Sequence, residues 1–243
     1  MSNILNMNHV EFGFVAALER EVSALVQNWT AMPVGVAGEK IYCHRSAALI
    51  CAGTGVARAH AAAKVLIEEC SPRVLVSIGF AGACVPDLRP GSIVVPATLL
   101  EAGTSRTFRC AFGRAQMVTL DRVAGKALKQ EAFARFGASA VDMEAAGVAV
   151  AAGECGKDFA AIKVISDGAE EDLRFLADFV KPEGFETRRF VAHIAFRPGL
   201  WPSVAVLNRN SKLAAAALVS AVRECMNDAT AFSAKYSSAA TQV

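Results

Sequence analysis

Phe159-Ala160-Ala161-Ile162-Lys163-Val164-Ile165-Ser166 is an almost continuous apolar stretch. A stretch of this kind predicts a strand covered on both faces, as in a mainly parallel sheet that lies between helices. Comparable stretches alternate with helix-like segments along the chain. We therefore predict an α/β fold, a three-layer αβα sandwich around a central mixed, mainly parallel, twisted sheet.

The other predicted elements follow this alternation. We expect strands over residues 10–16, 41–45, 47–52, 73–78, 92–96, 116–120 and 139–143, and helices over 19–27, 57–69, 122–136 and 144–156. Toward the C-terminus we expect a helix over 172–180, an amphipathic or strand-like segment over 190–196, a loop over 197–202, and a helix over 211–227 capped by Ser211. The whole chain, 1–243, is predicted to be a single domain with a flexible tail over about 233–243.

The composition is that of a globular protein without a nucleic-acid partner. Hydrophobic residues make up 53% of the chain, charged residues 20%, and the net charge is +2. Lys and Arg are scattered, so nothing favours nucleic-acid binding. The seven Cys include no C-x-x-C pair and the four His lie far apart, which predicts reduced thiols and no metal site. We see no secretory signal and no membrane-spanning segment, and we expect a cytoplasmic protein.

Several strand ends carry residues that could bind a ligand, because ligands of open α/β sheets bind beyond the carboxyl ends of strands. The turn Gly53-Thr54-Gly55 leads into a helix and could hold an anion through its backbone N–H groups, or could serve packing alone. Arg58 stands where a dinucleotide fingerprint has its third Gly, which disfavours a nicotinamide-dependent oxidoreductase. A second turn is expected over Gly79–Gly82, where glycines would permit close approach of a ligand.

Two carboxylates end apolar strands. Glu144 follows Val141-Asp142-Met143, and Asp167 follows Ile165-Ser166. Either could be a helix-start carboxylate or cap, since negative charge is favoured there. Two carboxylates on neighbouring strands favour a shared site.

These motifs resemble the nucleoside phosphorylase family that includes methylthioadenosine/S-adenosylhomocysteine nucleosidase. Val141-Asp142-Met143-Glu144-Ala145-Ala146 is similar to the family's V-E-M-E-A-A, and Ile165-Ser166-Asp167 to its I-S-D. Residues 16–22 and the two glycine turns match in the family's order, so the resemblance spans about residues 10–170.

The resemblance implies an enzyme that breaks a purine–ribose bond without a metal or cofactor. The purine leaves more easily when N7 is protonated, and a buried carboxylic acid can donate that proton. The resemblance gives this role to Asp167, ribose binding to Glu144 with Met143, and water activation to Glu21. The base would be bound by Ser166, Val123, Phe80 and Gly79.

Departures from the family pattern leave hydrolysis and phosphorolysis both open. Asp142 replaces a Glu, and Phe80 stands where a hydroxyl residue helps phosphorylases bind phosphate. Arg20 matches a phosphate-binding Arg of hexameric purine nucleoside phosphorylases, just before the nucleosidase-like Glu21. Gly55 and Arg58 are further candidates for the phosphate or water site, although the sequence favours Arg58 as a solvated helix-start residue over a phosphate ligand. Phosphate would be the co-substrate in phosphorolysis.

The segment between Pro96 and Glu144 is short, and Val123 falls near the family's base clamp. With Phe80 and the apolar residues 190–196 and 200–207 around Trp201, this resembles the hopanoid-biosynthesis-associated phosphorylase branch. That branch is thought to remove adenine from adenosylhopane, so we favour a 5′-modified adenosine as substrate. The alternatives are a methylthioadenosine-type nucleosidase and a non-catalytic nucleoside-binding protein. The family implies a homo-oligomer, and residues 196–207 suggest transient membrane contact, unless they are core or a subunit interface.

Overall fold

The computed structural model describes residues 10–34, 39–173, 178–181, 184–186, 189–190, 197, 199 and 201–238. The main elements, in chain order, are β1 (Phe12–Ala16), α1 (Glu19–Val26), β2 (Thr30–Val34), β3 (Glu39–His44), β4 (Ala47–Cys51), α2 (Val56–Cys70), β5 (Val74–Ala83), β6 (Ile93–Val94), β7 (Pro96–Glu101), β8 (Arg106–Arg109), β9 (Ala115–Thr119), α3 (Lys126–Phe136), β10 (Ala140–Asp142), α4 (Ala145–Glu154), β11 (Asp158–Asp167), α6 (Trp201–Asn227) and α7 (Ala229–Ser237). Two short strands, β12 (Val180–Lys181) and β13 (Gly184–Phe185), pair separately.

The main sheet is mixed and consists of two groups of parallel strands that meet at β5. β4, β1, β5 and β11 run parallel, with β1 and β11 on opposite edges of β5. β10 pairs antiparallel with the end of β5 and begins the second group, in which β10, β9 and β7 run parallel. β2 and β3 extend the first group as antiparallel strands. The predicted mixed, mainly parallel sheet is therefore confirmed, and the predicted strands 41–45 and 47–52 correspond to β3 and β4, which form a hairpin.

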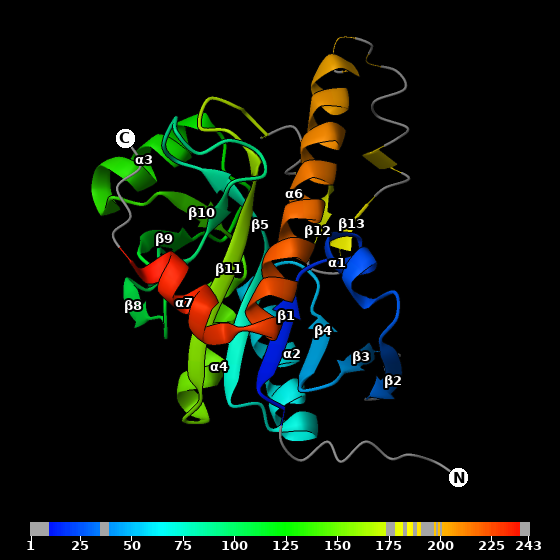
Figure 1. Ribbon diagram of the computed structural model, residues 1–243. Coiled ribbons are helices and arrows are strands. Elements are labelled where there is room, and N and C mark those ends of the chain that lie inside the picture. Colours follow the sequence, from blue (N-terminus) through cyan, green and yellow to red (C-terminus); the bar gives the residue numbers. More distant parts are fainter. Residues whose placement is uncertain are drawn as a thin grey trace.

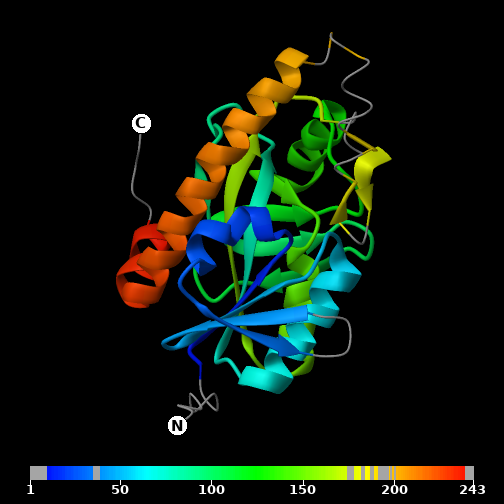
Figure 2. The ribbon, with the colours of Figure 1, turned by 90° about the vertical axis from the view of Figure 1, so that its right-hand side faces the viewer.

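Helices cover both faces of the sheet (Figures 1 and 2). α2 and α4 pack on one face, where Leu66 and Val148 are buried. α1, α6 and α7 pack on the other, where Val22, Leu218 and Phe232 are buried. The sequence of α4 is apolar almost all round, which explains why this helix is enclosed rather than lying at the surface. The predicted three layers are thus present.

α6 differs most from its prediction. It begins at Trp201, so Ser211 lies inside the helix and the predicted cap is wrong. The predicted loop over 197–202 ends earlier, because Trp201 and Pro202 belong to the first turn of α6. Proline is well tolerated there because the first turn needs no N–H donor. The first half of α6 extends beyond the body of the molecule, and Trp201 is 56% exposed (Figure 1).

Other boundaries also differ. Of the predicted helix over 172–180, Asp172 and Leu173 have no regular structure and Val180 lies in β12, while 174–177 lie outside the described residues. Of the predicted segment 190–196, only Phe190 is described, in a helical turn; 191–196 lie outside the described residues. α3 begins at Lys126 rather than 122. Residues 233–237 of the predicted tail belong to α7, which Asp228 caps by accepting a hydrogen bond from the N–H of Ala231 at 2.8 Å.

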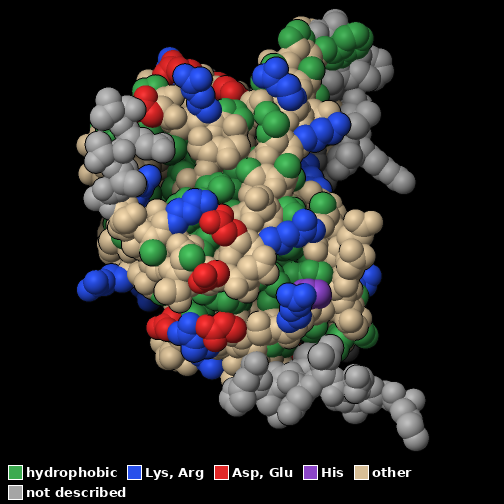
Figure 3. Space-filling view, in the orientation of Figure 1, with side chains coloured by type: hydrophobic (Ala, Val, Ile, Leu, Met, Phe, Trp, Pro, Cys, Tyr) green, Lys and Arg blue, Asp and Glu red, His purple; other side chains and the backbone are tan. Residues whose placement is uncertain are grey.

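The described surface carries mixed charge. Basic and acidic side chains are interspersed over the described part of the face drawn in Figure 3. All seven Cys lie in the described ranges, and none of them forms a disulfide. No helix in the described ranges has both the length and the apolar character needed to cross a membrane.

Candidate active site

A cavity of about 720 Å³ opens where the two groups of parallel strands meet. Its floor is formed by the ends of β5, β10 and β11, and its rim by the segments that follow β1 and β9. The exposed half of α6 forms one wall. This is the size of a small-molecule site, and it lies where the strand direction changes, as ligand sites of α/β sheets do.

Glu144 is fixed by two backbone donors. It occupies the N-cap position of α4, but its carboxylate makes no capping hydrogen bond. The N–H of Gly55 donates to Oε1 at 3.0 Å and the N–H of Met143 to Oε2 at 3.3 Å. The Gly53–Gly55 turn therefore holds a carboxylate of the protein itself, in the way such turns hold external anions.

Lys163 lies beneath Glu144 and is 1% exposed. Its Nζ pairs with Oδ2 of Asp142 at 2.8 Å. Asp142 also accepts hydrogen bonds from Thr119 Oγ1 at 2.6 Å and from the N–H of Ala145 at 2.9 Å. Asp142 is thus fully engaged in anchoring the start of α4. We call Lys163, Asp142, Glu144 and Glu21 the Lys163 cluster.

Glu21 is the least satisfied member of this cluster. It is 5% exposed, and its Oε2 has no hydrogen-bond partner among the described residues. Burial raises the pKa of Glu21 to about 7, and the Glu144 carboxylate adds to the rise, while Lys163 and Arg20 oppose it. Burial likewise raises the pKa of Glu144 to about 7, against the effect of Lys163. Burial disfavours the Lys163 ammonium, but Asp142 and the two glutamates more than offset this and raise its pKa.

The predicted turn over Gly79–Gly82 is wrong, because β5 continues through it to Ala83. Gly79 has φ +141°, and a Cβ there would lie 2.9 Å from Glu21 Oε2 and 3.9 Å from Lys163 Nζ. The glycine is needed so that Glu21 can pack against the strand. Gly79 therefore shapes the floor of the site behind Glu21 instead of forming a loop around a ligand.

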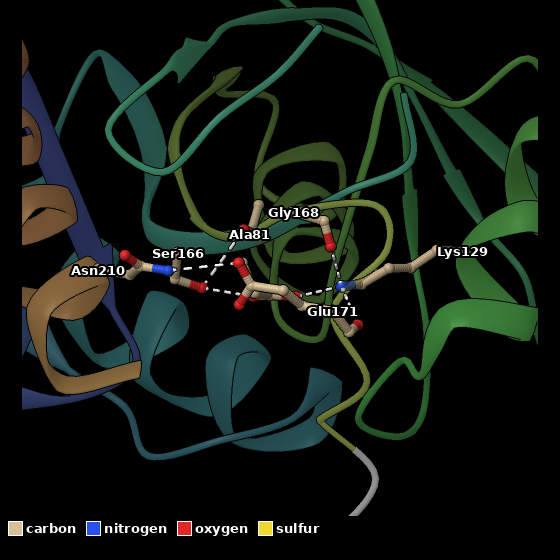
Figure 4. Close-up of polar contacts among 7 residues, drawn as sticks. Ala81, Lys129, Ser166, Gly168, Glu171 and Asn210 are labelled. Atoms are coloured by element: carbon tan, nitrogen blue, oxygen red, sulfur yellow. Dashed lines mark hydrogen bonds and ion pairs between the residues drawn. The ribbon is translucent and has the colours of Figure 1, made fainter. Parts of the chain in front are cut away.

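Asp167 is paired with a second buried lysine. Ser166 Oγ donates to Asp167 Oδ1 at 2.7 Å, and Lys129 Nζ forms an ion pair with Oδ2. Lys129 comes from α3, is 0% exposed, and also donates to the carbonyl oxygens of Gly168 at 2.8 Å and Glu171 at 3.1 Å (Figure 4). Lys129 and Asp167 are called the Lys129 pair below.

The cavity brings most of the predicted site residues together. Those that line it are Arg20, Glu21, Phe80, Val123, Met143, Glu144, Ser166 and Asp167. Three do not line it. Gly79 lies behind Glu21 and Gly55 behind Glu144, each covered by the carboxylate that it supports. Arg58 is exposed on α2 and does not line the cavity.

Sequence reasoning missed both lysines and the α6 wall. Lys163 interrupts an apolar strand, and a charged residue in such a strand is rarely buried unless it is paired. Its position in the sequence could therefore have indicated a buried ion pair. Lys129 lies in a helix rich in charged residues, where nothing distinguishes it from its neighbours. The sequence analysis placed Trp201 in a loop and gave Val204 and Leu207 no secondary structure. All three lie on α6 and line the cavity.

The architecture is that of solved nucleosidases. The 5′-methylthioadenosine/S-adenosylhomocysteine nucleosidase of Helicobacter pylori superposes with a TM-score of 0.64 at 16% identity, over 89% of this chain and 99% of that one. Futalosine hydrolase of the same organism gives 0.63 at 16%, over 88% and 98%. S-adenosylhomocysteine nucleosidase of Streptococcus pyogenes gives 0.59 at 24%, over 72% and 91%. At these identities the likeness establishes the fold.

Family membership follows from the sequence profile of the phosphorylase superfamily, which matches residues 11–124 and 117–192. These ranges contain all of the motifs on which the resemblance was based, and the carboxylates of those motifs line one cavity. The predicted superfamily and the prediction of an enzyme are confirmed. This chain belongs to the phosphorylase superfamily.

Proposed function

We propose that this enzyme cleaves the N-glycosidic bond of a 5′-modified adenosine and releases adenine. One observation carries the proposal: Glu144 and Asp167, from separate strand ends, line the same cavity. A nucleoside between them would have its sugar near one carboxylate and its base near the other. A carboxyl group that protonates the departing base, together with a carboxylate that orients the sugar, suits the cleavage of this bond.

The base-side role falls to Asp167. Its carboxyl group would pass a proton to the purine as negative charge develops there, with Ser166, Phe80 and Val123 around the base. On the sugar side, Glu144 would accept hydrogen bonds from ribose hydroxyls, with Met143 against the ring. Glu144 is already held by two backbone N–H groups, so its carboxylate needs little reorganisation when the sugar binds.

We propose water rather than phosphate as the nucleophile, with no cofactor. Glu21 supports this, because a buried carboxylate whose pKa is about 7 and whose Oε2 lacks a partner is suited to accept a proton from water. Support for phosphate is weaker. Gly55 already donates to Glu144, and Arg58 lies outside the cavity. Arg20 lines the cavity and remains the phosphate ligand of the alternative, phosphorolysis.

For the 5′ substituent we propose a large apolar group, as in adenosylhopane. Support comes from the wall of α6, where Trp201, Val204, Ala205 and Leu207 line the cavity beside Phe190 and Leu173. Hydrophobic and basic side chains share the exposed end of this helix (Figure 3). An apolar wall favours an apolar substituent through the surface that it removes from water. The alternative is a methylthioadenosine-type nucleosidase.

We retain two proposals about assembly that rest on the family resemblance and the apolar residues 196–207. One is a homo-oligomer, which light scattering of the purified protein tests by its mass. The other is transient membrane contact, which co-sedimentation with vesicles of neutral lipid tests. A monomeric mass and protein that stays in the supernatant would remove both.

Adenine release from a series of 5′-alkyl adenosines tests the proposed function. Methylthioadenosine serves as the short member, and each substrate is assayed with and without phosphate. We expect kcat/KM to rise with chain length, by up to about fourfold per methylene that becomes buried, and to be independent of phosphate. Strong turnover of methylthioadenosine with no gain for longer chains would favour the alternative substrate, and dependence on phosphate would favour phosphorolysis.

Two variants separate an enzyme from a nucleoside-binding protein. Asp167→Asn should lower adenine release by about 10²- to 10⁴-fold while ligand binding persists. Glu144→Gln should weaken ribose binding and turnover together. Leu213→Ala is the control, because Leu213 is exposed on α6 and outside the cavity. If the wild type binds the nucleoside but releases no adenine, the protein is a non-catalytic nucleoside-binding protein.

A further inference from the structure

The first half of α6 has a face that belongs neither to the core nor to the cavity. Val204 and Ser211 line the cavity, and Ala214 is buried against the sheet. Val206 and Leu213 do neither, and they are 40% and 52% exposed. An α-helix has 3.6 residues per turn, so two residues seven positions apart lie on the same face. Apolar side chains that share an exposed face mark a contact surface, whereas single ones need no explanation.

This face also carries positive charge. Arg209 and Lys212 lie between Val206 and Leu213 in the sequence, and both are exposed. Arg209 is three residues after Val206 and four before Leu213, spacings that place it on the same side of the helix. We call Val206, Arg209, Lys212 and Leu213 the outward face. Figure 3 shows hydrophobic and basic side chains together over this end of α6.

The positive charge extends along the sequence on both sides of the outward face. Residues 187–223 contain six Lys and Arg and no Asp or Glu. The rest of the chain contains 19 Lys and Arg against 23 Asp and Glu. The cations are spaced apart, and it is the lack of acidic residues that makes this segment basic. A basic segment on a molecule whose remainder is net negative favours an anionic partner.

We propose that the outward face docks on an anionic lipid surface. The inference deepens the membrane contact proposed above, because it names the lipid charge and the residues that meet it. Val206 and Leu213 would enter the boundary between headgroups and acyl chains, as the apolar side of an interfacial amphipathic helix does. Arg209 and Lys212 would lie at the lipid phosphates, where each basic residue raises the affinity about fivefold.

Charge favours lipid over a second copy of this chain. In a symmetric dimer the same patch meets itself, so Arg209 and Lys212 of one copy would face those of the other. Like charges brought together across an interface weaken it. A nucleic acid would match the two cations but would leave Val206 and Leu213 in water. An anionic lipid surface matches both the charge and the apolar side chains.

Docking by the outward face brings the mouth of the cavity to the lipid. Ala205 lines the cavity and is exposed, and it is the neighbour of Val206 on the helix. Trp201 also lines the cavity at the projecting end of α6 (Figure 1). Tryptophan is enriched where membranes meet water, because its ring is amphipathic. A large apolar 5′ group can therefore pass from the lipid to the wall of α6 without crossing water.

Co-sedimentation with vesicles of phosphatidylcholine, with and without phosphatidylglycerol, tests the charge. We expect weak binding to phosphatidylcholine and at least about tenfold tighter binding when phosphatidylglycerol is present, with the gain lost at high salt. Arg209→Gln/Lys212→Gln should lose about 25-fold in affinity for the mixed vesicles, about fivefold per cation. The control is Arg106→Gln/Arg109→Gln, the same change of charge on the exposed edge strand β8. No gain from phosphatidylglycerol, or equal losses in the two variants, overturns the inference.

The apolar half of the face has its own test. Val206→Ser/Leu213→Ser should weaken binding to both kinds of vesicle. Phe133→Ser is the control, because Phe133 is 51% exposed on α3. If Val206→Ser/Leu213→Ser leaves vesicle binding unchanged but converts a dimer into a monomer in light scattering, the face binds a second copy and the inference is wrong.

Adenine release from a soluble 5′-alkyl adenosine in lipid-free buffer reports on the proposed function separately. The four residues of the outward face do not line the cavity, so their variants should release adenine at the wild-type rate. A wild type that binds mixed vesicles but releases no adenine refutes the proposed function and leaves the docking in place. A wild type that releases adenine but binds neither kind of vesicle refutes the docking alone.

Discussion

The two ends of the cavity differ in how their buried charges are balanced. At one end, the Lys163 cluster places one ammonium among three carboxylates. At the other, the Lys129 pair balances one ammonium with one carboxylate and two carbonyls. Burial, with neighbouring carboxylates adding to its effect, raises the pKa of Glu21 and Glu144 to about 7 at the first end, whereas at the second end each charge has its partner. The comparison teaches that the same two residue types give different electrostatic environments when their ratio and their hydrogen-bond partners change.

Glu21→Gln should give the largest effect, because it removes the proton acceptor of the first end. We expect kcat for adenine release to fall by about 10²- to 10⁴-fold. The wild-type rate should rise as pH increases through about 7, the pKa of Glu21, since only the deprotonated form accepts a proton. The control is Glu19→Gln on the same helix, where Glu19 is exposed and accepts from the Tyr42 hydroxyl at 3.1 Å. If kcat of Glu21→Gln stays within about threefold of the wild-type value, Glu21 does not accept the proton, and the proposed difference between the two ends of the cavity is wrong.

Lys163→Met removes the buried cation of the Lys163 cluster. The free energy of unfolding in urea should fall by about 3–5 kcal/mol, the usual result of leaving a buried partner charged and alone. The loss should be smaller at low pH, where Glu21 and Glu144 are protonated and repel Asp142 less. Lys126→Met, at the surface, should change the stability little. Equal losses in the two variants would mean that the cluster contributes nothing through its charge.

The smallest expected effect is the pH dependence of stability. The pKa of Glu21 is about 7 in the folded protein and 4.5 when unperturbed, so the folded state binds the extra proton. The stability due to this proton is complete below about pH 4.5 and is lost as pH rises through 7, by an amount on the order of 3 kcal/mol for one such carboxyl. Glu21→Gln should flatten that part of the stability curve. A wild-type curve that rises over this range would contradict the raised pKa.

The sequence predicted the sheet and the two central carboxylates because these depend on local signals. The apolar run of β11 and the strand ends at Asp142 and Asp167 are visible in composition and order alone. The path of β5 through Gly79 and Gly82 was not visible, since two glycines normally indicate a turn. Packing explains them, because Glu21 lies against Gly79, and Asp167 and Lys129 lie against Gly82. The start of α6 was missed because Pro202 resembles a loop residue until its place in the first turn is known. The Lys129 pair joins residues from separate elements, which no local pattern reports.

The continuation of β5 through Gly79 and Gly82 also determines which side of the cavity can adapt. A strand paired along its length with β1, β11 and β10 cannot shift without breaking its neighbours' hydrogen bonds. The opposite wall is a single helix, half of which stands clear of the sheet. Engineering for new nucleosides should therefore keep the floor unchanged and vary α6, where a side chain can be exchanged while the carboxylates of the floor stay in place.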